Sequence, residues 1–269
     1  MFKIGVMTDS FRRGLKGGIE AAGELGAEGV QIYATRGEMA AENMTPSKIS
    51  DLRKILRDNG LVVSALCADF GGHGFTVKED NAERIEKSKR VVDLVLKLDS
   101  RIITTHIGVV PETPDDTYKV LQEACNDIGS YAEKNGAVFA VETGPEKAEV
   151  LASFLDSLST AGVGVNMDPA NLVMLYGDDP VKAVHTLAKY IVHTHAKDGI
   201  RLDPPQVIKG RKHGYLETPL GEGGVDFEKY LDALREIGFD GFLTIEREVG
   251  EDPYGDIKMA VEFLRKKIR

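Results

Sequence analysis

The sequence predicts an α/β protein that forms a single (β/α)8 TIM barrel over residues 1–269. Short apolar runs alternate with longer amphipathic runs along the whole chain, and we count eight of each. No stretch with the composition of an interdomain linker divides the 269 residues. Eight strand–helix units in a chain of this length are typical of a closed parallel barrel.

Each expected strand is a short apolar run, and each expected helix is an amphipathic stretch between two such runs. The predicted strands span residues 3–8, 29–34, 61–69, 101–108, 138–143, 163–168, 190–197 and 242–248. The predicted helices span residues 18–25, 46–59, 81–98, 115–135, 148–160, 180–187, 226–237 and 255–267. The order is therefore strand then helix throughout.

The junction from a helix to the next strand recurs in one form, with a glycine directly after the last helical turn. It reads ELGAEGVQIY, RDNGLVVSAL, EKNGAVFAVE, STAGVGVNMD and REIGFDGFLTIE. Glycine is expected there because the chain takes a left-handed conformation to end a helix. A doubly wound open sheet is less favoured, since TDSFRRGLKGG after the first strand lacks the glycine spacing of a dinucleotide-binding loop.

One connection, residues 199–224 after the seventh strand, is long and shows no clear periodicity. A loop at this place lies on the catalytic face of a barrel, which favours a lid or binding loop over a tolerated insertion. Its Lys209, Arg211 and Lys212 could bind a substrate phosphate, but a basic loop tip is more often simply solvated.

Composition and charge narrow the class of protein. The formal net charge is -9 and the sequence pI is about 5.3, which disfavours nucleic acid as a partner. No apolar run is long enough to span a membrane, and the start MFKIGVMTD lacks a signal-peptide pattern. Cys67 and Cys125 form neither a disulfide framework nor a zinc-knuckle spacing. We therefore expect a cytoplasmic protein without a membrane or nucleic-acid partner.

In a parallel barrel, the C-terminal ends of all strands meet at one mouth, where active sites lie. Alternate residues of a strand share a face, so Glu142 and Glu246 can both point inward, as can His193 and His195. The polar residues at or beyond the expected strand ends are Thr8, Asp9, Tyr33, Asp69, His106, Glu142, Asp168, Asn171, His195 and Glu246.

Four of these groups, Glu142, Asp168, His195 and Glu246, come from the consecutive strands five to eight and therefore lie on one side of the mouth. Three carboxylates and one imidazole form a mostly hard ligand set for one divalent metal. Mn²⁺ is expected first, with Mg²⁺, Co²⁺ or Zn²⁺ as alternatives. The competing interpretation is that each acid simply pairs with a lysine or arginine at the strand end.

Four further polar residues near the predicted ligands are each expected to have a role of their own. His193 lies deeper on the same strand as His195 and is expected to bond a neighbouring strand inside the barrel. His106 is expected to contact the substrate, with a core role as the alternative. Lys197 and Asp198 either support the ligands from behind or form an exposed ion pair, and the sequence leaves this open.

Seven runs together resemble the sugar phosphate isomerase/epimerase family, the xylose isomerase-like barrels, over essentially the whole chain. They are ALCADFGG, THIG, VET, NMDPAN, HAKD, PLGEGGVDF and GFDGFLTIERE. The resemblance implies that the four predicted ligands form the family's single divalent-metal site, and it suggests a homodimer or homotetramer. Arg201, six residues past His195, matches an arginine that contacts the sugar in ketose 3-epimerases. The residues expected to bind the substrate are thus His106, Arg201, Asn171 and Asp69.

Two departures from that family pattern are informative. Relatives of the apurinic endonucleases carry a histidine three residues after the aspartate, where this chain has Asn171, so a cluster of zinc ions is hard to build. The 3-epimerases carry a glutamate six residues after the first metal glutamate, where this chain has Ala148. Glu146 or Glu149 could take its place.

These observations predict a divalent-metal-dependent isomerase or epimerase of a ketose or related hydroxyketone derived from a sugar or polyol. Glu142 and Glu246 are the expected catalytic residues, one removing a proton and the other returning it through an enediolate that the metal stabilises. Loss of a hydroxyl from the same enediolate would instead make a dehydratase of an inosose-like hydroxyketone. A non-catalytic sugar-binding module is the third alternative.

Overall fold

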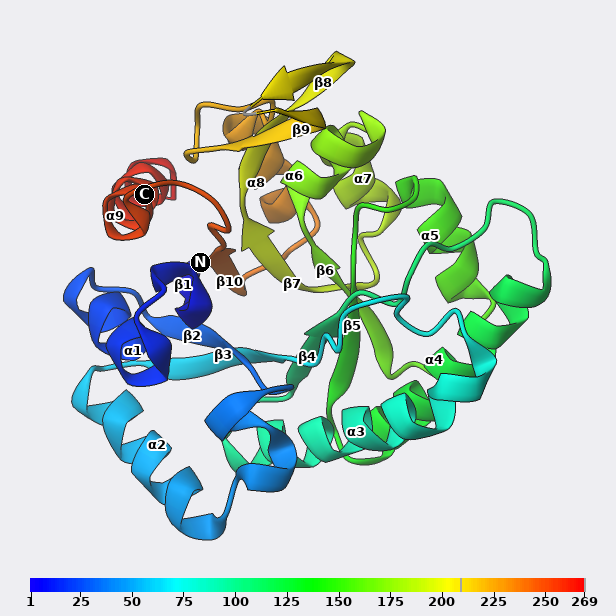
Figure 1. Cartoon of the computed structure of the whole chain (residues 1–269), viewed down its shortest axis with the longest axis horizontal. Coiled ribbons are helices and arrows are strands. Elements are labelled where there is room, and N and C mark those ends of the chain that lie inside the picture. The colour runs from blue at the N-terminus through cyan, green and yellow to red at the C-terminus, as the bar shows by residue number, and fades with distance from the viewer. Residues whose placement is uncertain (209, 269) are drawn as a thin grey trace.

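The chain folds as a closed barrel of parallel strands with helices packed around it, as the sequence predicts (Figure 1). The computed structural model describes residues 1–208 and 210–268, so Lys209 of the basic loop tip lies outside the described residues. Within the described residues, the barrel strands pair in the order β1-β10-β7-β6-β5-β4-β3-β2. Pairing of β1 with β2 closes the ring.

The barrel strands are β1 (Lys3–Met7), β2 (Gly29–Tyr33), β3 (Val62–Cys67), β4 (Ile102–Thr105), β5 (Val138–Glu142), β6 (Val163–Met167), β7 (Ile191–Ala196) and β10 (Phe242–Ile245). The helices are α1 (Gly14–Glu24), α2 (Pro46–Asp58), α3 (Lys78–Lys97), α4 (Asp116–Lys134), α5 (Ala148–Asp156), α6 (Pro169–Asn171), α7 (Pro180–Thr186), α8 (Phe227–Glu236) and α9 (Pro253–Lys267). Shorter helical turns are η1 (Thr8–Phe11), η2 (Gly37–Met39), η3 (Ala41–Asn43) and η4 (Leu172–Tyr176).

The helices cover the barrel with one apolar face each. In α4, the buried residues Leu121, Ala124, Cys125, Ile128 and Ala132 follow the spacing of a single helix face. The helix begins where the side chain of its N-cap aspartate accepts a hydrogen bond from the backbone. None of the described helices is both long and apolar enough to cross a membrane.

Several predicted boundaries differ from the observed ones. The predicted strands included Asp69, His106 and Glu246, but β3, β4 and β10 end before these residues, because the chain leaves the ladder to enter the loops of the mouth. Helix α1 begins at Gly14 rather than at residue 18. A Cβ on Gly18 would lie 2.6 Å from the Thr8 carbonyl oxygen, so close packing requires glycine there.

The segment expected to be an irregular loop over residues 199–224 forms instead an antiparallel hairpin, so this prediction is wrong. Its strands are β8 (Asp198–Ile208) and β9 (Arg211–Thr218), and residues 219–224 after β9 lack regular structure. The ladder is interrupted between Arg201 and Gln206, which breaks the alternation that a sequence pattern would show. In Figure 1 the hairpin projects beyond the barrel beside α6, after β7, where the connection was expected.

Candidate metal centre and active site

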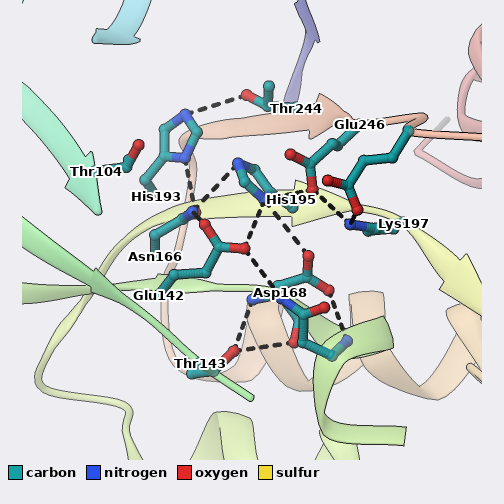
Figure 2. Close-up of polar contacts among 12 residues, drawn as sticks. Thr104, Glu142, Thr143, Asn166, Asp168, His193, His195, Lys197, Thr244 and Glu246 are labelled. Carbon is teal, nitrogen blue, oxygen red and sulfur yellow. Dashed lines mark hydrogen bonds and ion pairs between the residues drawn. The ribbon is translucent and has the colours of Figure 1, made fainter. Parts of the chain in front are cut away.

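The four predicted metal ligands lie together at the C-terminal mouth of the barrel (Figure 2). Glu142 ends β5, Asp168 follows β6, His195 lies in β7 and Glu246 follows β10, and these four strands are adjacent in the ring. One ligand atom from each residue lies within 4.8 Å of all the others. Adjacent parallel strands therefore bring these four groups together at one point, as expected for a barrel mouth.

The cluster is buried and centred on one imidazole nitrogen. The exposed fractions of Glu142, Asp168, His195 and Glu246 are 6%, 0%, 1% and 8%. His195 Nδ1 lies 3.5 Å from Glu142 Oε1, 3.5 Å from Asp168 Oδ2 and 3.4 Å from Glu246 Oε2. None of the three acids pairs only with a strand-end lysine or arginine, so the competing surface interpretation does not describe them.

Two atoms of the cluster lack hydrogen-bond partners among the described residues, His195 Nδ1 and Asp168 Oδ2. An unsatisfied buried polar atom costs about 1–3 kcal/mol. Both atoms point to the same centre, where a cation within coordination distance would satisfy them. The donor set of three carboxylates and one imidazole therefore fits a divalent ion such as Mn²⁺ or Mg²⁺.

The other nitrogen of His195 fixes which atom faces the centre. His195 Nε2 lies 3.1 Å from the amide oxygen of Gln31, which can only accept a hydrogen bond. Nε2 therefore donates its proton to Gln31, whose own amide nitrogen donates to Thr104. This arrangement turns Nδ1 toward the carboxylates, as the outer partner of a metal-binding histidine does.

The electrostatics of the site favour positive charge at its centre. Burial lowers the pKa of His195, but the charges of Glu142 and Glu246 outweigh it and raise that pKa well above its ordinary value. Burial also opposes charge on Glu246, yet Lys197 and His195 hold its pKa well below the usual range. The pKa of Glu142 is likewise lowered against burial, mainly by His106 and His195.

Beneath the ligands, polar side chains bond across the barrel interior. His193 Nδ1 donates to Asn166 Oδ1 at 2.9 Å, and Thr244 donates to His193 Nε2 at 3.1 Å. Asn166 Nδ2 in turn donates to Glu142 Oε2 at 3.1 Å. Burial and the charge of His195 lower the pKa of His193 well below its ordinary value, so it is neutral. The prediction of a buried interior histidine bonded to a neighbouring strand is confirmed.

Asp168 is held by the short helix that it caps. It precedes Pro169 at the first position of α6, and its Oδ1 accepts the backbone N–H of Asn171 at 2.9 Å. The Asn171 side chain donates to Glu142 Oε1 at 3.0 Å. Thr143 donates to the Asp168 carbonyl oxygen and accepts from its backbone N–H, both at 2.9 Å. Asn171 thus positions two of the candidate ligands, which the sequence did not predict, and its substrate contact stays a prediction.

His106 and Asp69 lie beside the cluster. His106 Nδ1 bonds Asp69 Oδ2 at 2.8 Å, and its Nε2 lies 3.4 Å from Glu142 Oε1. The Glu142 charge is the largest cause that raises the pKa of His106 to about 10, with Asp69 adding to it. The His106 side chain is 44% exposed, so the alternative core role does not hold. The pair lies beside Glu142 at the mouth, and substrate binding by both residues stays a prediction.

Lys197 and Asp198 are both buried, so they are not an exposed ion pair. Lys197 Nζ lies 2.9 Å from Glu246 Oε2 and 2.6 Å from Glu248 Oε2. The carboxylate of Asp198 accepts backbone N–H groups at residues 199, 221, 223 and 225, which fastens the segment after β9 to the end of β7. One residue therefore supports a ligand and the other anchors a loop.

Among the described residues, Arg201 forms no hydrogen bond with any of the four candidate ligands. Its side chain is exposed on β8 and donates to the carbonyl oxygen of Tyr176 at the end of η4. Contact of Arg201 with a sugar stays a prediction. Two glutamates near Ala148 were considered as substitutes. Glu146 is buried at the mouth, whereas Glu149, on α5, is exposed and pairs with Lys182 of α7.

Sequence reasoning missed Gln31 and Asn166, which hold His195 and Glu142. Each lies two residues before a polar strand-end position, Tyr33 and Asp168, and so shares its inward face. Strand parity was therefore a usable signal for both. No pattern in the sequence joined Lys197 to Glu248, because that contact links the ends of two strands through side chains alone.

A closed parallel barrel with three carboxylates and one imidazole at its mouth defines a TIM-barrel protein with a candidate metal centre. The chain belongs to the xylose isomerase-like TIM barrel family, whose model matches residues 19–267. The family resemblance predicted from the sequence is thus confirmed.

Inosose dehydratases are among the curated proteins that this chain is similar to. Inosose dehydratase of Clostridium tetani is 29% identical over 154 residues, which cover 53% of this chain and 50% of that protein. The match therefore spans about half the length of that curated relative.

Solved structures agree over nearly the whole chain. The xylose isomerase domain protein from Planctomyces limnophilus has a TM-score of 0.84 at 29% identity, covering 98% of this chain and 96% of that one. A D-psicose 3-epimerase studied in the presence of D-fructose has a TM-score of 0.75 at 18% identity, covering 99% of each chain. The latter likeness shows the fold. Dehydratase and epimerase names both occur among the similar proteins, and the comparisons do not choose between them.

Proposed function

We propose that this protein is a divalent-metal-dependent isomerase or epimerase of a ketose or related hydroxyketone. The observation that carries the proposal is the buried cluster of three carboxylates and one imidazole, with two ligand atoms that lack other partners. A bound ion would supply the positive charge that makes a C–H bond beside a carbonyl acidic. The hard ligand set favours Mn²⁺, with Mg²⁺, Co²⁺ or Zn²⁺ as alternatives.

Glu246 is the group best placed to remove a proton from carbon. Lys197 donates to its Oε2, whereas no described residue donates a hydrogen bond to its Oε1. Glu246 also lines a cavity of about 180 Å³ at the mouth, so a substrate can approach it. The charge of Lys197 keeps the carboxylate ionised, and an ionised carboxylate is the form that accepts a proton.

Glu142 is the proposed partner on the opposite side of the ligand set. Asn166 and Asn171 hold its two oxygens, and His106 reaches one of them from the mouth. A proton removed by Glu246 and returned through Glu142 to the other face of the same carbon gives epimerisation. Its return to the neighbouring carbon gives aldose–ketose isomerisation. His106, oriented by Asp69, would contact the substrate oxygens between the two glutamates.

A dehydratase is the second candidate, favoured by the match to an inosose dehydratase over half of that protein. It needs the same removal of a proton, followed by loss of the hydroxyl on the adjacent carbon. A sugar-binding module without turnover is the third candidate. The three differ in what happens to the substrate after it binds.

The test is a screen of ketoses, ketose phosphates and inososes with the purified protein and Mn²⁺ in deuterated water. Solvent deuterium beside the carbonyl, with no loss of water from the product, is the result we expect. A product that has lost water would assign the dehydratase. Binding of a ligand with no deuterium in it would contradict any proton transfer and leave a binding module.

Glu246→Gln tests the base directly. The amide cannot accept the proton, so turnover should fall by about a hundredfold to ten-thousandfold, while Mn²⁺ still binds with reduced affinity. Glu248→Gln is the matched control, because Glu248 also bonds Lys197 but is mostly exposed. Near-normal turnover by Glu246→Gln would remove Glu246 from the proposed role.

A further inference from the structure

A second cavity opens beside the metal cluster on the β2–β3 side of the mouth. It has a volume of about 680 Å³ and is lined by the last residue of β2, by residues that follow β2 and β3, and by the N-terminal half of α3, with Tyr33, Asp69, Phe70 and Arg84 among them. We call it the distal cavity. Its volume lies in the range of about 300–1,000 Å³ that small-molecule sites occupy.

The distal cavity adjoins the proposed reaction centre at two points. Asp69 in its wall bonds His106, which in turn lies against Glu142. Tyr33 and Arg36 line both this cavity and the smaller one that reaches Glu246. A substrate whose reacting carbons lie at the cluster could therefore extend its remaining atoms into the distal cavity.

Most charged groups in or beside this cavity already have an ionic partner. The pairs are Arg36 with Asp9, Lys87 with Glu83, Asp80 with His73, and Asp69 with His106. A ligand that used one of these groups would first have to break its pair.

Arg84 is different. Its Nη1 donates to the Gly71 carbonyl oxygen at 3.0 Å, and over residues 1–208 and 210–268 no carboxylate lies within ion-pair distance of it. The bond to Gly71 fixes the guanidinium against the DFGG run, while its other N–H groups have no acceptor in the part of the protein that the structure describes. A half-buried guanidinium with uncommitted donors is suited to a carboxylate or phosphate, which it can bind through two parallel hydrogen bonds.

We propose that Arg84 binds an anionic group, a carboxylate or a phosphate, at the end of the substrate remote from the reacting carbons. The inference rests on the proposed function and deepens it, because it narrows the substrate to hydroxyketones that carry such a group. It also places the anion site in the distal cavity rather than at the basic tip of the hairpin.

The experiment compares the affinities of three probes for the Mn²⁺-loaded protein by calorimetry: D-fructose, D-fructose 6-phosphate and 5-keto-D-gluconate. The wild-type protein should prefer at least one anionic probe over D-fructose by about tenfold to a hundredfold, as a charge-assisted hydrogen bond allows. Arg84→Gln should abolish the preference, and Arg84→Lys should keep part of it. The two anionic probes separate a phosphate ligand from a carboxylate ligand.

Arg90→Gln is the matched control, since it removes the same charge from the same helix at an exposed position that does not line the distal cavity. It should leave every affinity unchanged. Equal binding of the anionic probes by wild type and Arg84→Gln, or no binding of either anion, would overturn the inference. An equal loss for D-fructose and the anions would show only a structural role for Arg84 and would overturn it as well.

The same probes in deuterated water separate this inference from the proposed function. Anion binding that depends on Arg84, without deuterium exchange in any probe, would retain the anion site and refute the proton transfer. Exchange into D-fructose without any preference for anions would retain the proton transfer and refute the anion site.

Discussion

The two halves of the barrel mouth differ in how their charges are arranged. In the half formed by β5, β6, β7 and β10, charged side chains are buried and bonded to one another around one centre. In the half formed by β2, β3 and β4, most of them are partly exposed ion pairs around an open cavity of about 680 Å³. Burial strengthens electrostatic interactions, whereas exposure lets water screen them. The first half is therefore suited to chemistry and the second to selecting a substrate.

The largest effect is expected from removing a ligand in the buried half. His195→Gln should weaken Mn²⁺ binding by at least about a hundredfold, because the imidazole is the group that the three carboxylates surround. Isothermal calorimetry with Mn²⁺ measures this. His185→Gln, on an exposed face of α7, should bind Mn²⁺ as the wild type does. Unchanged affinity of a folded His195→Gln would mean that the ligand set is wrong.

Lys197→Met tests how far the buried half depends on the buried ammonium group of Lys197. Its removal leaves Glu246 and Glu217 buried with less compensating charge, which should lower the free energy of unfolding by about 3–5 kcal/mol. Urea denaturation of the metal-free protein gives the value. Lys189→Met, which breaks an exposed pair with Asp156, should change it by about 0.5 kcal/mol or less. A loss no larger than that of the control would show that Lys197 is not a structural counter-ion.

Glu146 lies between the halves and should make stability depend on pH. Burial raises its pKa from 4.5 to about 7, against a hydrogen bond from the Val110 backbone and the charge of His106. Between these values the folded state keeps a proton that the unfolded state has lost, so this group lowers stability as pH rises.

The prediction for Glu146→Gln follows from that sign. Its stability relative to the wild type should increase by about 3 kcal/mol between pH 4 and pH 8, because the amide does not titrate. Denaturation curves at the two pH values measure the change. Glu262→Gln, at an exposed position on α9, should show a flat difference. A flat difference for Glu146→Gln would mean that Glu146 is ionised in the fold at ordinary cost.

The smallest effect is expected at the tip of the hairpin. Arg211 and Lys212 are exposed on β9 and are not among the residues that line the distal cavity. The double variant Arg211→Gln/Lys212→Gln should alter the preference for D-fructose 6-phosphate over D-fructose by about twofold or less, since exposed charges contribute little. A loss comparable to that of Arg84→Gln would move the anion site to the tip.

Much of the fold and the ligand set could be predicted because both depend on periodic signals. Alternation of apolar runs placed all the barrel strands, and the positions of the strand ends placed Glu142, Asp168, His195 and Glu246 at one mouth. The hairpin was missed because its ladder is irregular between Arg201 and Gln206. The start of α1 was predicted too late, at residue 18 rather than at Gly14, because the glycines of this helix serve close packing against Thr8.

What the sequence determined by itself is the barrel, the order of its strands and the four side chains that meet at its mouth, since local periodicity and a fixed topology are enough for each. Only the tertiary structure decided that Lys197 is buried against Glu246, that Gln31 orients His195, and that Arg84 has no acidic partner among the described residues. Each of these facts depends on how side chains from distant parts of the chain are placed relative to one another. No spacing along one sequence encodes such a contact, because packing between separate elements sets it.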